Sequence, residues 1–287
     1  MIAHVAEADE ARGRVVVQFR SGHPNAVALE AAVRVAQAFQ SGIESLFVED
    51  LELISLAGFP FAREISLNGR SSRSICCSDI EQEYRLAFAS AHRRIQALAR
   101  AADVPVRQRV VRDEPVAALA AACSECGPWN VVALAEPFGP PGSGSLRTLF
   151  ASVADATGVV IVGPRARRTT GPVIVAVENL EALPSMLPAA ERLAAVSGGS
   201  LLVLLVTDDP DSLHWIEGEA RLLLGDRPDV QLVAVGFAPG ASAAVAETLR
   251  KLRAGFIICQ LGGLVVPEDE DLKPLAAGLE CPLFIVR

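Results

Sequence analysis

The sequence predicts an α/β protein with two doubly wound, parallel five-stranded sheets, and three observations lead to this prediction. Short segments rich in Val, Ile and Leu alternate with longer, Ala-rich segments along all 287 residues. Such alternation is typical of βαβ units, in which helices cover both faces of a parallel sheet. The same order of segments then occurs a second time, so each half is expected to contain five strands and four helices.

The first half has the clearer pattern. Its apolar runs predict strands at 14–20, 43–50, 106–112, 130–136 and 158–164. Its longer segments predict helices at 25–40, 78–102, 115–125 and 146–156, with Asn25 and Ser78 as N-cap residues. Residues 51–77 form an insertion without a counterpart in the second half, and we expect a flexible loop or flap on the surface.

The second half follows the same order in fewer residues. Its strands are expected at 171–178, 200–207, 230–237, 255–261 and 281–287. Its helices are expected at 180–197, 212–225, 241–254 and 269–279, the last with Asp269 as its cap. The polar and basic segment 165–171 joins the halves, so we place one domain at about 1–165 and a second at 166–287.

Composition and charge exclude several classes of protein. Apolar residues make up 51% of the chain, which is enough to bury large cores, and the net charge is −8. An acidic protein is poorly suited to nucleic acid or to an anionic membrane surface, so we expect neither as a partner. The apolar runs are too short to span a bilayer and no apolar leader is visible, which favours a cytoplasmic location.

A ligand crevice is expected where the strand order reverses. In an open sheet of order 3-2-1-4-5, the strand order reverses between the neighbouring strands one and four. Ligands bind beyond the carboxyl ends of these two strands. In the first half the loops at this point are 21–25 and 137–145. The second loop contains Gly139, Gly142, Gly144 and Ser145, whose backbone N–H groups are candidates to receive phosphate oxygens.

Cysteines and catalytic motifs give little support for other chemistry. The segment CSECGPW (123–129) contains a C-x-x-C, Cys123 and Cys126. The adjacent Cys76 and Cys77 are a poor substitute for a second spaced pair, so a zinc or redox site is the less favoured reading. Cys259 and Cys281 lie in apolar strands and are interpreted as core residues. No Walker A, nucleophile-elbow or HExxH motif appears, and we assign no catalytic residue.

The segments ALEAAVRVAQAFQSGIESLFVED (28–50) and LFASVADATGVVIVGP (149–164) resemble universal stress proteins. The resemblance covers both halves and implies a tandem universal stress protein with a flavodoxin-like, adenine nucleotide α-hydrolase-like fold. Family dimers often pair through their last strands. The resemblance therefore implies that VVIVG (159–163) pairs with LFIV (283–286) in an intramolecular pseudo-dimer, while a further homodimer stays open.

Nucleotide-binding members of this family carry Gly-x2-Gly-x9-Gly-[Ser/Thr] after strand four, and an Asp after strand one. This chain has Gly139-x2-Gly142, then Ala151-Ser152 one residue early, and Phe19-Arg20-Ser21 in place of the Asp. The resemblance implies ATP or AMP as the ligand, with no metal beyond the Mg²⁺ of the nucleotide. The candidate binding residues are Arg20, Ser21, Val48, Gly139, Gly142, Gly144, Ser145 and Ser152.

Two features predict weak binding that is confined to the first half. Pro140 and Pro141 remove two N–H donors from the loop, so we expect AMP to bind about as well as ATP. In the second half Gly262 and Gly263 are followed by acidic residues at the expected helix start, which repel phosphate: Glu268, Asp269, Glu270 and Asp271.

We therefore expect a non-catalytic stress or regulatory protein that acts through an unidentified protein partner. Two alternatives stay open. One is an interaction scaffold without a ligand, and the other is a nucleotide hydrolase of the related fold, because fold does not fix function.

Overall fold

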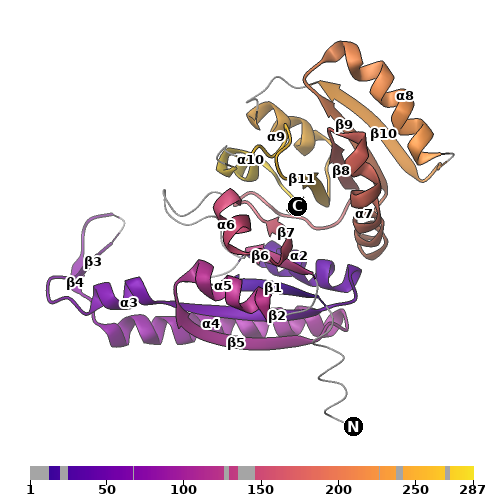
Figure 1. The fold of residues 1–287 in the computed structure, drawn as a ribbon. Coiled ribbons are helices and arrows are strands. Elements are labelled where there is room, and N and C mark those ends of the chain that lie inside the picture. The colour runs from indigo at the N-terminus through magenta and orange to yellow at the C-terminus, as the bar shows by residue number, and fades with distance from the viewer. Residues whose placement is uncertain are drawn as a thin grey trace, which may run out of the picture.

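A computed structural model describes residues 13–19, 25–66, 68–125, 129–134, 146–225, 227–236, 242–268 and 272–287. Its centre is one sheet of ten strands (Figure 1). The first half contributes β1 (Arg14–Phe19), β2 (Gly42–Asp50), β5 (Val106–Asp113), β6 (Asn130–Leu134) and β7 (Ala156–Ile161). The second half contributes β8 (Val173–Val177), β9 (Leu201–Thr207), β10 (Val230–Gly236), β11 (Phe256–Gln260) and β12 (Leu283–Val286).

Both halves of the sheet have the strand order expected from the sequence. The full order is β10-β9-β8-β11-β12-β7-β6-β1-β2-β5, which gives 3-2-1-4-5 in each half. All pairs within a half are parallel, as buried Val- and Leu-rich strands favour. The α/β fold predicted from the sequence is therefore confirmed.

The prediction of two separate sheets is wrong, because the last strand of each half pairs with the other. β12 lies antiparallel to β7, with Leu283 opposite Ile161 and Val286 opposite Gly158. This pairing satisfies backbone groups that two separate sheets would each leave open at an apolar edge. Because the junction is antiparallel, the carboxyl ends of the strands in the two halves face opposite edges of the sheet.

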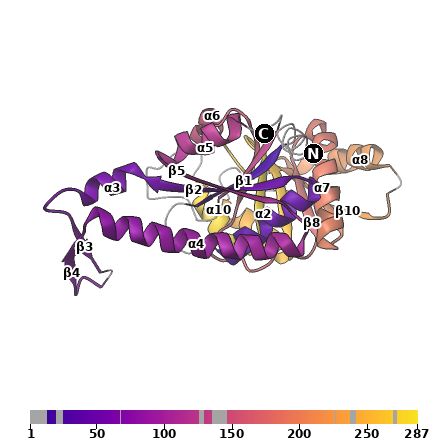
Figure 2. The ribbon, with the colours of Figure 1, turned by 90° about the horizontal axis from the view of Figure 1, so that it is seen from below.

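Helices cover both faces of the sheet. They are α2 (Ala26–Ala38), α4 (Cys77–Ala101), α5 (Pro115–Ser124), α6 (Leu146–Ser152), α7 (Leu183–Ser197), α8 (Leu213–Leu224), α9 (Ser242–Lys251) and α10 (Lys273–Gly278). Two short 3₁₀ turns, η1 (Leu180–Ala182) and η2 (Pro210–Ser212), precede α7 and α8. In the first half, α2 and α4 lie on one face, and α5 and α6 on the other (Figure 2). Within the described ranges no helix is long and apolar enough to cross a membrane.

Of the two predicted N-cap residues that the structure describes, Asn25 is confirmed and Ser78 is not. The Asn25 side chain accepts a hydrogen bond of 2.9 Å from the N–H of Val27, as an N-cap should. Ser78 is not a cap, because α4 begins one residue earlier, and Cys76 holds the cap position without a side-chain hydrogen bond to a helix N–H group. Asp269 lies outside the described residues.

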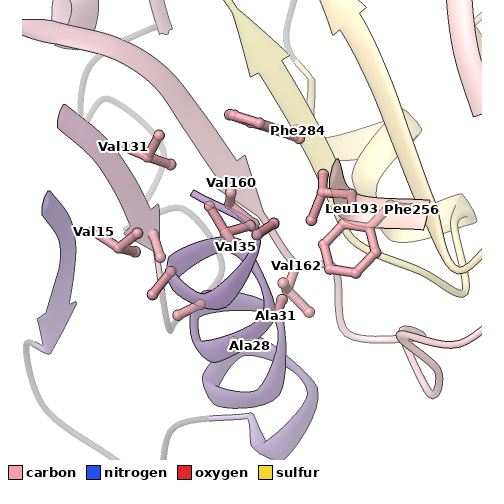
Figure 3. Close-up of a cluster of buried hydrophobic side chains, with 14 of the residues drawn as sticks. Val15, Ala28, Ala31, Val35, Val131, Val160, Val162, Leu193, Phe256 and Phe284 are labelled. Carbon is pink, nitrogen blue, oxygen red and sulfur yellow. The ribbon is translucent and has the colours of Figure 1, made fainter. Parts of the chain in front are cut away.

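Each face of the sheet carries a hydrophobic core that runs through both halves. On one face, Val15, Val131 and Val160 of the first half share a core with Leu193 and Phe284 of the second (Figure 3). The Phe39 ring packs edge-on against Phe284, with 6.3 Å between ring centres. On the other face, residues of α5 and α6 share a core with residues of α9, α10 and β12. The two halves therefore pack as one unit.

The insertion at 51–77, for which we expected a flexible loop or flap, contains regular secondary structure. It forms α3 (Leu51–Ala57) and an antiparallel hairpin, β3 (Arg63–Ile65) and β4 (Ser72–Ser74). Asp50 caps α3 by accepting a hydrogen bond of 2.9 Å from the N–H of Glu52. Together with the start of α4, these elements make an arm that extends away from the second half (Figures 1 and 2).

The segment 165–171 is held between the halves by polar contacts. Arg168 forms an ion pair of 2.9 Å with Glu280. Thr169 is buried, and its hydroxyl accepts a hydrogen bond of 2.9 Å from the Arg34 guanidinium of α2. This connection therefore contacts both halves along its length, beyond joining them in sequence.

The β7–β12 junction predicts the effect of one glycine substitution. A Cβ at Gly158 would lie 2.6 Å from the Phe284 ring and 3.0 Å from the Ile285 carbonyl oxygen. Gly158→Val should therefore lower the free energy of unfolding by about 1–3 kcal/mol, measured by urea denaturation. As a control, Gly218→Ala in α8 meets no atom within 4 Å and should raise stability by about 0.5–1 kcal/mol. Equal stability of Gly158→Val and the unchanged chain would contradict this account of the junction.

Candidate functional site

The second half contains a well-described crevice at the point where its strand order reverses. β8 and β11 are neighbours in the sheet, and the chain then leaves them for opposite faces, toward α7 and α10. A pocket of about 250 Å³ lies at their carboxyl ends. Its lining residues come from the ends of β8 and β11 and from the start of α7: Ala176, Val177, Glu178, Asn179, Ala182, Met186, Gln260, Leu261, Gly262 and Gly263.

The side chain of Glu178 lies across this crevice. Glu178 directly follows β8, and its carboxylate accepts hydrogen bonds from two consecutive backbone N–H groups, those of Leu264 and Val265. The bond from Val265 measures 2.8 Å. Two adjacent N–H groups that converge on one carboxylate form the kind of anion-binding arrangement that loops use for phosphate.

The turn after β11 is built to present these N–H groups. Gly262 adopts a positive φ of 90°, which a residue with a side chain rarely adopts, and its N–H donates to the Val266 carbonyl at 2.8 Å. Val265 and Val266 are buried in the core beside α9 and α10. The turn is therefore fixed by the packing of Val265 and Val266 in the core and by the hydrogen bond of Gly262. In this conformation the N–H groups of Leu264 and Val265 are directed at Glu178.

The helix after this turn begins later than the sequence predicts. α10 begins at Lys273, four residues later than expected, with Pro274 in its first turn where the fixed φ suits a helix. Of the acidic run, Glu268 is described, and 269–271 lie outside the described residues. Glu268 does lie near the turn, because a Cβ at Gly262 would be 3.3 Å from its Oε1. Glu178, which sequence reasoning missed, is the carboxylate in the crevice.

In the first half the strand order reverses between β1 and β6, and the loops that follow these two strands lie outside the described residues. Six of the predicted site residues lie in these two undescribed segments, 20–24 and 135–145: Arg20, Ser21, Gly139, Gly142, Gly144 and Ser145. Val48 lies at the carboxyl end of β2, one residue beyond the last pair that β2 forms with β1, and its side chain is fully buried. Ser152 is exposed at the last turn of α6.

The described wall of the first crevice is supported by hydrogen bonds. Gln18, near the end of β1, is buried and its side-chain amide donates to the Pro115 carbonyl at 2.6 Å. Glu49 at the end of β2 pairs with Arg112 at 2.7 Å, so it acts as a structural anion at the edge of the sheet. These contacts fix the carboxyl ends of β1 and β2, where the predicted site would lie.

The residue after the first strand differs in charge between the halves. Phe19 ends β1 and is followed by Arg20, whereas Val177 ends β8 and is followed by Glu178. The equivalent position therefore carries a cation in the first half and an anion in the second. Coulomb interactions with a phosphate have opposite signs for these two side chains.

Three of the five described cysteines are core residues. Cys123, Cys259 and Cys281 are buried, while Cys76 is exposed and Cys77 half-buried. Burial raises the pKa of the Cys281 thiol to about 12, and burial together with the charge of Glu178 also raises the pKa of Cys259. Cys126 lies outside the described residues, and among those described no three side chains of the metal-binding types come together.

Solved structures with the same fold include two proteins of nearly equal extent. One is a universal stress protein from Archaeoglobus fulgidus DSM 4304, with a TM-score of 0.58 and 13% identity over 95% of this chain and 96% of that one. The other is the cytoplasmic domain of a prokaryotic cation chloride cotransporter, with a TM-score of 0.53 and 13% identity over 96% and 95%. At this identity the likeness shows the fold alone. Neither a family model nor a curated protein matches the sequence.

The accessibility of the thiols gives a direct test of the described burial. Because the thiolate is the reactive form, a buried thiol of raised pKa should stay unmodified at neutral pH. Iodoacetamide at pH 7.5 should modify Cys76, and leave Cys123, Cys259 and Cys281 unmodified until the chain is unfolded in urea. Mass spectrometry of tryptic peptides measures this. Modification of Cys259 at the rate of Cys76 in the folded chain would contradict the described burial.

Proposed function

We propose that this chain is a tandem universal-stress-type regulatory protein that binds one adenine nucleotide in its first half and catalyses no reaction. The likeness in fold to a universal stress protein over 95% of the chain supports the family. The tandem arrangement is supported by the equal strand order of the two halves. In this proposal the domains are 1–165 and 166–287.

The difference in charge at the end of the first strand is the observation that carries the proposal. Arg20 follows β1 and offers a guanidinium to a phosphate group, whereas Glu178 in the second half offers a carboxylate. In the first half, β2 also extends three residues beyond its last pair with β1, and these residues would lie beside the expected ligand. Backbone groups of Val48 can serve the adenine ring there, while Arg20 serves the α-phosphate.

The proposed site favours the nucleoside monophosphate end of the ligand. Pro140 and Pro141 lack N–H groups, and a hydrogen bond to a charged group contributes about 1.5–3 kcal/mol. The loop is therefore short of donors for the β- and γ-phosphates. AMP and ATP should consequently bind with similar dissociation constants, and Mg²⁺ should add little.

A second candidate function is an interaction scaffold, which the arm at 51–77 favours. Phe59 and Phe61 stack with 5.3 Å between ring centres and remain 51% and 75% exposed, and Ile65 on the hairpin is 66% exposed. Exposed apolar groups gathered on a projecting element are typical of a protein contact. In the scaffold alternative this arm binds the partner and neither crevice binds a nucleotide.

Isothermal titration calorimetry with AMP and with ATP, each with and without Mg²⁺, tests the proposal. We expect one nucleotide per chain and similar dissociation constants for the two ligands. Arg20→Glu, which gives the first half the charge of the second, should weaken AMP binding by about 10- to 100-fold. Arg94→Ala, an exposed change on α4, serves as the control and should leave binding unchanged.

The other outcomes separate the alternatives. Tight, Mg²⁺-dependent binding of ATP that is lost in Gly142→Val would show that the loop is a full phosphate site. Absence of binding by either nucleotide supports the scaffold. Steady release of phosphate or AMP, abolished by Arg20→Glu, would identify a hydrolase instead.

A further inference from the structure

Glu178 occupies the position that an anionic ligand would take in the second crevice. Its carboxylate receives the N–H groups of both Leu264 and Val265, which lie 86 and 87 residues away in the sequence. These donors belong to the turn after β11, at the point where the strand order reverses and ligands of doubly wound folds bind, and consecutive backbone N–H groups of this kind form anion sites. The turn therefore holds an anion, and that anion is part of the chain.

We propose that Glu178 is an internal ligand that fills the anion site of the second crevice and excludes phosphate-bearing ligands from it. This proposal goes beyond nucleotide binding in the first half and does not depend on it. It assigns to Glu178 the role of a specificity-determining residue. The ligand class that it excludes consists of inorganic phosphate and phosphate monoesters.

Competition and charge both oppose a phosphate at this turn. A phosphate would have to displace a carboxylate that is tethered beside its donors, and a short tether gives the internal group an effective concentration in the millimolar range or above. The displaced carboxylate would stay in the same pocket and repel the phosphate. Glu268, whose Oε1 lies close to Gly262, adds a second negative charge at the turn.

Gly263 is the residue that admits the carboxylate. A Cβ at this position would lie 2.4 Å from Oε2 and 2.5 Å from Oε1 of Glu178, so any other residue would force the carboxylate away from the turn. The carboxylate of Glu178 is at the end of a flexible side chain, so it can move away without a change in the backbone. Glu178 and Gly263 therefore form a matched pair, and each offers a separate way to open the site.

Amide NMR of the full chain tests the proposal with inorganic phosphate as the probe. In Glu178→Ala, phosphate should shift the amide resonances of Leu264 and Val265 with saturation, at a concentration at least about tenfold below any response of the unchanged chain. Glu181→Ala is the matched control, because it removes the same charge from an exposed position in the next turn and should leave both amides unresponsive. Following these two amides keeps the result separate from any binding in the first half.

Hydrogen exchange on the unchanged chain keeps the test independent of whether Glu178→Ala folds. The amides of Leu264 and Val265 should exchange slowly, and Gly263→Ala, which keeps the charge but displaces the carboxylate, should speed both by about tenfold or more. Fast exchange of both amides in the unchanged chain overturns the proposal. A response of these amides to millimolar phosphate in the unchanged chain, or none in folded Glu178→Ala, also overturns it.

Discussion

The antiparallel pairing of β7 with β12 is the contact on which the rest of the molecule depends. Each half ends in a short apolar strand, and the pairing gives both strands the hydrogen bonds that they would lack alone. It also brings Phe39 against Phe284 and merges the cores on both faces of the sheet. Arg287 adds a further contact across the β7–β12 junction, since its N–H donates to the Thr157 carbonyl at 3.1 Å. Neither half could keep its present core if the other were removed.

The same pairing determines where the two crevices lie. Because the halves run in opposite directions across the junction, the ends of β8 and β11 lie at the edge of the sheet opposite to the ends of β1 and β6. The arm formed by α3, β3 and β4 extends from the carboxyl end of β2, on the edge of the first crevice. A partner held by the arm would consequently lie nearer the first crevice than the second.

Periodicity made most of the fold predictable, and long-range contacts account for what was missed. Buried strands such as Leu201–Thr207 are almost wholly apolar, and their alternation with Ala-rich helices indicates the fold without further information. The pairing of β7 with β12 was expected, yet two separate sheets were predicted where the structure has one. The arm was missed because α3 and the hairpin are short and expose apolar side chains such as Phe61. Glu178 could not be assigned from sequence, since its partners depend on how a distant turn folds; its place directly after a first strand was the only signal.

Joining the two halves in one chain has a consequence for symmetry. Two identical subunits paired through their last strands would carry two identical crevices, because a two-fold axis imposes every substitution on both. Here the corresponding positions are encoded separately, and they hold Arg20 in one half and Glu178 in the other. Selection can therefore change one crevice while the other is preserved, and both still share the stability of a common sheet. The covalent connection converts a symmetric architecture into a polar one, with two chemically distinct ends.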